Sequence, residues 1–205
     1  MAATAAAIVT EALALVRRRP PTLGRLRLLA VDGPAGSGKT TLAERLVAAA
    51  PGSALVHVDD LLDGWDGLPR VGEAVRAALL PLAAGGTGTY TRYDWVAGAP
   101  GETVRLTAPP SGLVVLEGVG AAGPRVRDLA TAIVWVEAGS AERLRRGLAR
   151  DGAHLAPEWG RFRVAEQAHF AEAGTRAHAD LHWWTGTGPS TGVDGDVDTT
   201  AGVIG

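Results

Sequence analysis

A single lysine stands among the twenty basic residues of this 205-residue chain, in a glycine-rich segment suited to binding phosphate. Lys39 belongs to Gly33-Pro34-Ala35-Gly36-Ser37-Gly38-Lys39-Thr40, followed by Thr41, which fits the GxxxxGK[ST] pattern of a P-loop. The three glycines allow backbone conformations that let successive N–H groups surround phosphate oxygens. Lys39 could reach the β- and γ-phosphates of a nucleoside triphosphate, and the Thr40 hydroxyl could bind the Mg²⁺ that accompanies it. A glycine-rich turn without a ligand is the alternative.

Acidic residues stand at the ends of two apolar runs and could act on bound phosphates. Asp59 and Asp60 come after Val56-His57-Val58, and Asp59 is the candidate base or orienting group for an acceptor hydroxyl. Glu117 ends the run Val114-Val115-Leu116 and is the expected acid beside Mg²⁺, together with Thr40. The alternatives are a helix cap or turn for Asp59 and a structural salt bridge for Glu117. Asp60, Asp63 and Asp66 could share the task of Asp59.

Four arginines occupy eight positions in the segment 143–150, which is followed by Gly152. This pattern predicts a helix leading into a mobile lid, at about residues 146–157, that closes over phosphates. Arg146 and Arg150 lie one turn apart, so they would face the same side and stabilise the charge of the transferring group. A solvated charged helix face is the alternative.

The elements that must position these groups alternate between apolar strands and helices. Apolar runs at 26–31, 54–58, 113–116, 132–136 and 181–184 are typical of strands buried on both faces. They predict an α/β fold with a five-stranded parallel sheet, whose ligands gather at the carboxyl ends of the strands. Helices are expected at about 3–18, 70–82, 140–150 with Ser140 as cap, and 158–176. Alternation at 87–93 and 103–106 predicts a small hairpin on the substrate side.

Length and composition favour one domain, residues 1–184. The chain is 46% hydrophobic, carries a formal charge of −2 and lacks cysteine. The slightly negative net charge argues against a nucleic-acid-binding surface. The lack of cysteine excludes disulfides and zinc sites with cysteine ligands. The stretch 1–16 is a poor signal peptide, and no run approaches the roughly 20 apolar residues of a membrane span, so we expect a cytoplasmic location without a membrane partner. A homo-oligomer is left open.

The C-terminal segment 185–205 is rich in glycine, threonine and aspartate and is expected to be a flexible tail. Its segment Asp194-Gly195-Asp196-Val197-Asp198 superficially matches a calcium loop. It lacks the glycine at loop position six and the glutamate at position twelve. We therefore do not predict a calcium site.

Taken together, these segments resemble the uridine kinase and phosphoribulokinase branch of the P-loop kinases. The match is carried by Gly33–Thr41, Asp59-Asp60-Leu61-Leu62, Tyr93-Asp94-Trp95, Glu117-Gly118-Val119 and Arg143–Asp151. Trp65-Asp66-Gly67-Leu68, with Trp159, Phe162, Glu166 and Phe170, resembles the uridine kinase-like ATP-binding proteins of GC-rich bacteria. The three later aromatic residues are also expected in helix packing. The resemblance implies a P-loop NTPase of the nucleoside monophosphate kinase-like fold.

The resemblance also implies an ATP- and Mg²⁺-dependent kinase that transfers the γ-phosphate to a small-molecule hydroxyl, with a nucleoside, uridine or cytidine, as the leading acceptor. Asp59 would be the catalytic base, and Lys39, Arg146 and Arg150 would neutralise the phosphates. The acceptor pocket would form around Asp59, with the further residues Asp60, Arg70, Arg92 and Tyr93. Leu61-Leu62 replaces the family's aromatic pair, and Trp95 is followed by Val96-Ala97-Gly98 without the histidine that the resemblance leads us to expect there. A sugar acid, a coenzyme precursor or an antibiotic remain alternative acceptors, and a non-catalytic nucleotide switch is the alternative to an enzyme.

Overall fold

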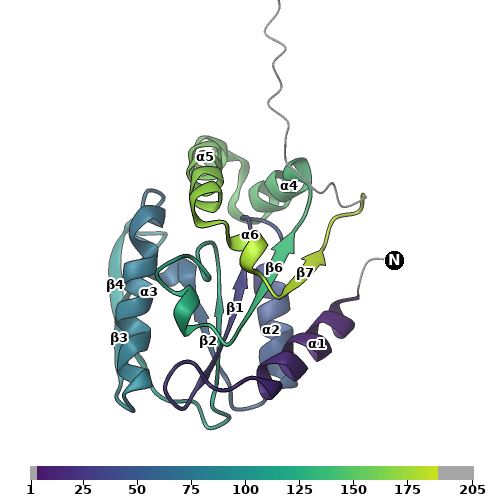
Figure 1. Ribbon diagram of the computed structural model, residues 1–205. Coiled ribbons are helices and arrows are strands. Elements are labelled where there is room, and N and C mark those ends of the chain that lie inside the picture. Colours follow the sequence, from purple (N-terminus) through teal and green to yellow (C-terminus); the bar gives the residue numbers. More distant parts are fainter. Residues whose placement is uncertain (1–3, 189–205) are drawn as a thin grey trace, which may run out of the picture.

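Five parallel strands form the central sheet of the computed structural model, which describes residues 4–188. The strand order is β2-β5-β1-β6-β7 (Figure 1). The strands are β1 Arg27–Asp32, β2 Ala54–His57, β5 Leu113–Glu117, β6 Ala132–Glu137 and β7 Leu181–Trp184. The predicted five-stranded parallel sheet is confirmed, and β1 lies at its centre between β5 and β6.

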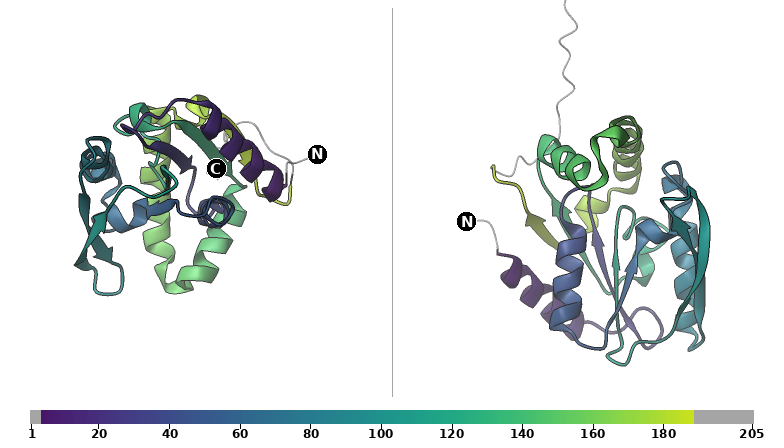
Figure 2. Two further views of the ribbon diagram at one scale, coloured as in Figure 1. Left: turned by 90° about the horizontal axis from the view of Figure 1, so that it is seen from below. Right: turned by 180° about the vertical axis from the view of Figure 1, so that it is seen from behind.

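Helices cover both faces of the sheet (Figures 1 and 2). They are α1 Ala5–Arg18, α2 Lys39–Ala49, α3 Leu68–Ala83, α4 Ser140–Asp151, α5 Ala156–Ala173 and the short α6 Thr175–His178. Leu29 and Val31 pack with α1 and α2, while Leu28 and Ala30 pack with α3. Side chains alternate across a strand, so one buried run supplies two cores.

The N-terminal helix α1 packs as its sequence predicts. Its buried residues are Ile8, Val9, Ala12, Leu13 and Val16, all on the expected apolar face. The Thr4 hydroxyl caps the helix by accepting a hydrogen bond of 3.2 Å from the Ala7 N–H. This amphipathic pattern therefore covers the sheet face that α2 leaves open.

The predicted hairpin is present as β3 Gly88–Asp94 and β4 Ala99–Leu106, paired antiparallel. It packs against α3 and against the 3₁₀ turn Val58–Leu61 that follows β2. A Cβ at Gly88 would lie 1.9 Å from the Ala78 carbonyl oxygen of α3, so only glycine permits this close approach. The hairpin thereby stands beside the carboxyl end of β2.

Several predicted boundaries are wrong. Gly139, not Ser140, precedes α4, and the Ser140 hydroxyl instead accepts a hydrogen bond from Arg163. Helix α5 ends at Ala173, three residues before the predicted Arg176, because Gly174 adopts a left-handed φ of 59°. The lid segment also contains regular structure, with a 3₁₀ turn at Ala153–Leu155 between α4 and α5.

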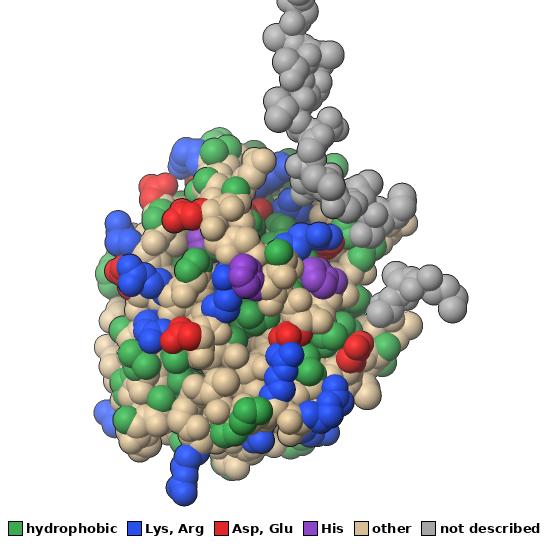
Figure 3. All heavy atoms as spheres, viewed as in Figure 1, with side chains coloured by type: hydrophobic (Ala, Val, Ile, Leu, Met, Phe, Trp, Pro, Cys, Tyr) green, Lys and Arg blue, Asp and Glu red, His purple; other side chains and the backbone are tan. Residues whose placement is uncertain are grey.

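The predicted C-terminal tail begins inside the folded body. The Thr185 N–H donates to the Glu137 carbonyl at 2.9 Å, which extends the pairing of β7 with β6 by one residue. Residues 189–205 of the expected tail, including Asp194–Asp198, lie outside the residues that the structure describes. Within residues 4–188, no helix has the length and apolarity needed to cross a membrane. Basic and acidic side chains are interspersed over the face seen in Figure 3.

Candidate active site

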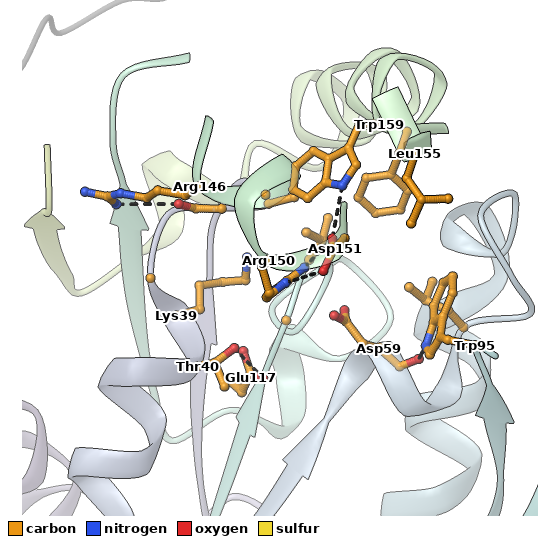
Figure 4. Close-up of a pocket in the computed structure, with 18 of the residues that line it drawn as sticks. Lys39, Thr40, Asp59, Trp95, Glu117, Arg146, Arg150, Asp151, Leu155 and Trp159 are labelled. Atoms are coloured by element: carbon orange, nitrogen blue, oxygen red, sulfur yellow. Dashed lines mark hydrogen bonds and ion pairs between the residues drawn. The ribbon is translucent and has the colours of Figure 1, made fainter. Parts of the chain in front are cut away.

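A pocket of about 750 Å³ lies at the carboxyl ends of β1, β2 and β5. The P-loop, the helix α4 and the turn of the hairpin form its walls (Figure 4). Among its lining residues are Gly36, Gly38, Lys39, Thr40, Thr41, Asp59, Glu117, Arg146 and Arg150. The topology therefore brings together groups that stand more than one hundred residues apart in the sequence.

The P-loop follows β1 and depends on glycine for two physical reasons. Gly33, Gly36 and Gly38 have φ values of 141°, 76° and 97°, a region that other residues rarely adopt. A Cβ added at Gly33 would lie 2.0 Å from the Val136 carbonyl oxygen, and a Cβ added at Gly36 would lie 2.4 Å from the Arg143 carbonyl oxygen. The first two glycines are thus also required by the backbones of β6 and α4.

Asp32, the last residue of β1, organises the loops beneath the pocket. Its fully buried carboxylate accepts backbone N–H bonds from Gly33 at 2.7 Å, Gly120 at 3.0 Å and Ala122 at 2.8 Å. Burial raises the pKa of Asp32 to about 6, although these bonds and Lys39 act in the opposite direction. The carboxylate joins the P-loop to the loop that follows β5.

Three polar side chains meet at the start of α2 and the ends of β5 and β2. The Thr40 hydroxyl donates to a Glu117 carboxylate oxygen at 3.2 Å, and His57 Nδ1 lies 2.6 Å from the same oxygen. The hydrogen bond to Glu117 raises the pKa of His57. Lys39 Nζ lies beside them in the P-loop and donates to the Pro34 carbonyl at 3.0 Å. The two residues expected at Mg²⁺, Thr40 and Glu117, therefore lie together, and His57 is an unexpected third member.

Asp59 stands in the 3₁₀ turn after β2 and lines the pocket. Its side chain is open to the pocket, yet the protein that surrounds it raises its pKa, and the charge of Lys39 only partly opposes this. The Trp95 indole N–H donates to the Asp59 carbonyl at 3.2 Å and so connects the hairpin to this turn. Figure 4 shows Asp59 between Lys39 and Trp95.

The two predicted lid arginines both line the pocket but have different partners. Arg146 donates to the Thr185 hydroxyl at 3.0 Å and to the Thr185 carbonyl at 2.9 Å, and it pairs with Glu142 at 2.5 Å. Arg150 pairs with Asp151 at 2.6 Å. Its positive charge also interacts electrostatically with Asp59 and Glu117. In this arrangement Arg146 fixes α4 to the end of β7, while Arg150 faces the acids.

Four residues expected around the acceptor do not line the pocket in the described part of the chain. Asp60 and Arg92 bind each other at 3.1 Å, and Arg92 also binds Glu102 at 2.8 Å. Arg70 pairs with Asp63 at the surface, and Tyr93 packs edge-on against Trp95. These contacts stabilise the hairpin and the loop before α3, since they satisfy the charges locally.

A buried ion pair behind the P-loop was not predicted as part of the site. Glu166 of α5 accepts the Ala35 N–H at 2.5 Å and binds Arg143 of α4 at 3.0 Å. Arg143 in turn donates to the Ala35 carbonyl at 3.3 Å and to the Ala138 carbonyl at 3.1 Å. Burial raises the pKa of Glu166. The only signal in the sequence was the resemblance that singled out Glu166 without a role.

The chain has a weak sequence similarity to one curated kinase. No protein-family model matches the chain. The curated Uridine-cytidine kinase C of Dictyostelium discoideum is 24% identical in an alignment 141 residues long, which covers 64% of this chain. The match spans 31% of that relative's length, so this chain corresponds to less than a third of it.

Solved structures share the fold. A possible uridine kinase from Bacillus stearothermophilus has a TM-score of 0.57 at 20% identity, over 77% of this chain and 88% of its own. A fructose transport system kinase candidate from Silicibacter sp. TM1040 has a TM-score of 0.56 at 22% identity, over 88% and 99%. D-glycerate 3-kinase from Cryptococcus neoformans has a TM-score of 0.50 at 14% identity, over 87% and 88%.

The parallel sheet, the P-loop and the acids at the strand ends define a P-loop protein with the kinase-type fold. Within that class, the chain is similar in sequence to a uridine-cytidine kinase and in fold to a possible uridine kinase.

Proposed function

We propose that this protein is an ATP- and Mg²⁺-dependent kinase that transfers the γ-phosphate to a hydroxyl of a small molecule, with a nucleoside as the leading acceptor. The observation that carries this proposal is the arrangement of Lys39, Thr40 with Glu117, and Asp59 around one pocket. A phosphate-binding loop alone serves many functions. An acid across the pocket from it gives an acceptor hydroxyl a partner, which favours transfer over simple hydrolysis.

The polar end of the pocket fits a magnesium nucleotide. Mg²⁺ prefers oxygen ligands and usually takes one or two protein oxygens, with phosphates and water completing its shell. Thr40 and Glu117 offer two such oxygens 3.2 Å apart. Residues 4–188 contain no group of three or more acidic or histidine side chains that could hold a metal ion alone. The donor set therefore suits an ion that shares its ligands with a nucleotide.

Each side chain would then have a defined task. Lys39 and Arg150 would lie against the phosphates and reduce the cost of the negative charge that spreads over them. Thr40 and Glu117 would hold Mg²⁺, which supplies charge neutralisation when bound. Asp59 would orient the acceptor hydroxyl and accept its proton while that oxygen bonds to phosphorus and the bond to ADP breaks. Positioning and charge would provide most of the rate acceleration.

The test measures ADP release from Mg·ATP across nucleosides, sugars, sugar acids and coenzyme precursors. Asp59→Asn should lower acceptor-dependent turnover by roughly 10²–10⁴-fold, while nucleotide affinity stays within a few-fold. Asp63→Asn is the matched control, because Asp63 is an exposed carboxylate of the same loop and does not line the pocket. Full turnover in Asp59→Asn would refute the role of Asp59. Tight ATP binding without any acceptor-dependent turnover would favour a nucleotide-dependent switch.

A further inference from the structure

The peptide that joins Pro34 to Ala35 in the P-loop is held at both of its polar groups. Its carbonyl oxygen, on Pro34, accepts a hydrogen bond of 3.0 Å from Lys39 Nζ. Its N–H, on Ala35, donates to the Glu166 carboxylate at 2.5 Å. In the proposed function Lys39 must turn away from this carbonyl to the phosphates of a bound nucleotide. Glu166 is then the side chain that still holds the peptide.

The next carbonyl group of the P-loop is held by the ion-pair partner of Glu166. Arg143 Nη1 donates to the Ala35 carbonyl at 3.3 Å and to Glu166 at 3.0 Å, and Arg143 Nε donates to the Ala138 carbonyl at 3.1 Å. The Arg143 and Glu166 side chains are only 7% and 5% exposed, so water competes little for these bonds. One buried ion pair therefore binds both polar groups of Ala35.

An ion pair is a costly way to join two helices inside a protein. Taking two charges out of water costs about as much as their attraction returns, so apolar side chains would join α4 to α5 at least as well. Gly147 and Trp159 already make such an apolar contact between the two helices. Apolar side chains cannot, however, bind the N–H and the carbonyl of Ala35. The distinct contribution of the pair is therefore the orientation of the P-loop backbone.

The backbone that follows Ala35 carries N–H groups suited to binding phosphate. Gly36 and Gly38 line the pocket, and within residues 4–188 their N–H groups donate to no protein acceptor. The direction of these groups depends on the peptide before them, because each residue adds only two soft dihedral angles. A loop that is already ordered loses less conformational freedom when a ligand binds. Fixing Ala35 therefore favours phosphate binding.

We propose that Glu166 is a positioning residue for phosphate binding: together with Arg143 it fixes the peptide groups of Ala35 and keeps the P-loop in its binding conformation before a nucleotide arrives. Glu166 is not among the described residues that line the pocket, so it acts through the loop backbone. The inference rests on the proposed function, because it assumes that the P-loop binds the phosphates of a nucleotide. It adds a requirement for a residue of α5 that follows the P-loop by most of the chain.

The decisive variant replaces both charges at once, Arg143→Met with Glu166→Met. Exchange of a buried ion pair for apolar side chains is often neutral or stabilising, whereas removal of one partner leaves an unpaired buried charge. The double variant therefore keeps the packing of α4 on α5, which its Tm reports, and removes the hydrogen bonds to Ala35. A structural role of the pair and a positioning role predict different binding in this variant.

Binding is measured by isothermal titration calorimetry with Mg·ADP and with Mg·tripolyphosphate, which has no base or ribose and so reports on the phosphate site. The double variant should bind both ligands about tenfold or more weakly, because the freed loop must be ordered during binding. Glu172→Gln, at an exposed acid of α5 outside the pocket, should change neither affinity. Leu13→Ala, at a buried position of α1, should lower the Tm and leave both affinities within about twofold.

Amide hydrogen exchange, followed by NMR, tests the loop in the ligand-free wild-type protein and needs no variant. After correction for intrinsic rates, the Ala35 N–H should exchange about 100-fold more slowly than those of Gly36 and Gly38, because it alone is bound to a buried carboxylate. Exchange of Ala35 at the rate of the two glycines would overturn the inference, whether or not the double variant folds.

The inference and the kinase proposal fail separately. A double variant with wild-type Tm and wild-type affinity for tripolyphosphate would show that the pair is structural, even if the wild-type protein transfers phosphate. The expected loss of affinity, in a protein that transfers phosphate to no acceptor, would support the positioning role and refute the kinase. A wild-type protein that binds neither Mg·ADP nor Mg·tripolyphosphate would refute both.

Discussion

Asp59 and Glu117 are both acids at strand ends, and their neighbours give them different chemistry. Glu117 is 4% exposed and is bound by Thr40 and His57, which keep its carboxylate in place beside the P-loop. The Asp59 side chain is open to the pocket and has a raised pKa because the surrounding protein disfavours its charge. A fixed acid suits a metal ligand, and an acid with a raised pKa suits proton transfer.

The raised pKa of Asp59 predicts the acidic limb of the pH profile. Asp59 must be ionised to accept a proton, so activity falls as the pH drops through its pKa, which lies above the usual 3.8. The value of kcat/KM, which reports the free enzyme, should fall about tenfold per pH unit below that midpoint. A limb centred at or below pH 3.8 would contradict this assignment. His57→Asn is the control, since a limb that disappears in it belongs to His57.

At the scale of elements, contacts between α4 and α5 shape the roof of the pocket. Gly147 of α4 lies under the Trp159 ring of α5, and Trp159 is 2% exposed. The Arg143–Glu166 pair joins the same two helices to the P-loop at Ala35. The segment predicted as a mobile lid is therefore anchored at both of its helices.

Gly147→Ala should destabilise this roof. The added Cβ would lie 2.1 Å from the Trp159 ring, a distance that forces the helices apart, and overpacking of this kind costs about 1–3 kcal/mol. Gly160→Ala is the matched control, because nothing lies within 4 Å of its Cβ. That variant should be neutral or up to about 1 kcal/mol more stable, since alanine favours a helix. Urea unfolding measures both, and equal stabilities would contradict the packing described.

At the scale of the whole molecule, the pocket lies where several separate segments meet. The P-loop, the turn after β2, the hairpin, α4 and α5 all contribute side chains to it. A ligand that contacts all of them stabilises the folded state, because unfolding disperses its partners. Binding should therefore be visible in global stability.

Mg·ATP at about 100 times its Kd should stabilise the protein by about 2.7 kcal/mol. For a chain of this size, that corresponds to a Tm increase of about 5–10 °C. Removal of Mg²⁺ with EDTA should reduce the increase, and Lys39→Ala should nearly abolish it, each compared with its own ligand-free Tm. An undiminished shift in Lys39→Ala would show that the nucleotide binds elsewhere.

The sequence alone predicted the sheet, the P-loop and the order of the acids. Apolar runs reveal buried strands because both faces of a parallel sheet must leave water, and glycine spacing reveals a loop whose backbone needs positive φ. The sequence also assigned Thr40 of the P-loop and Glu117 at the end of β5 to one Mg²⁺ site, and that role stays a prediction. Boundaries such as the end of α5 were missed, because Gly174 stops the helix inside an otherwise helical pattern.

Only the tertiary structure decided which side chains share the pocket. Asp60, Arg70, Arg92 and Tyr93 carry suitable chemistry, yet neighbouring charges and rings hold them outside it. Conversely, the aromatic wall of Trp65, Trp95 and Phe162 is assembled from three separate segments. Local sequence determines whether apolar residues recur with the spacing of a helix or of a strand, and which chemical groups the residues carry. The direction in which a loop side chain points depends on long-range packing, which no local pattern contains.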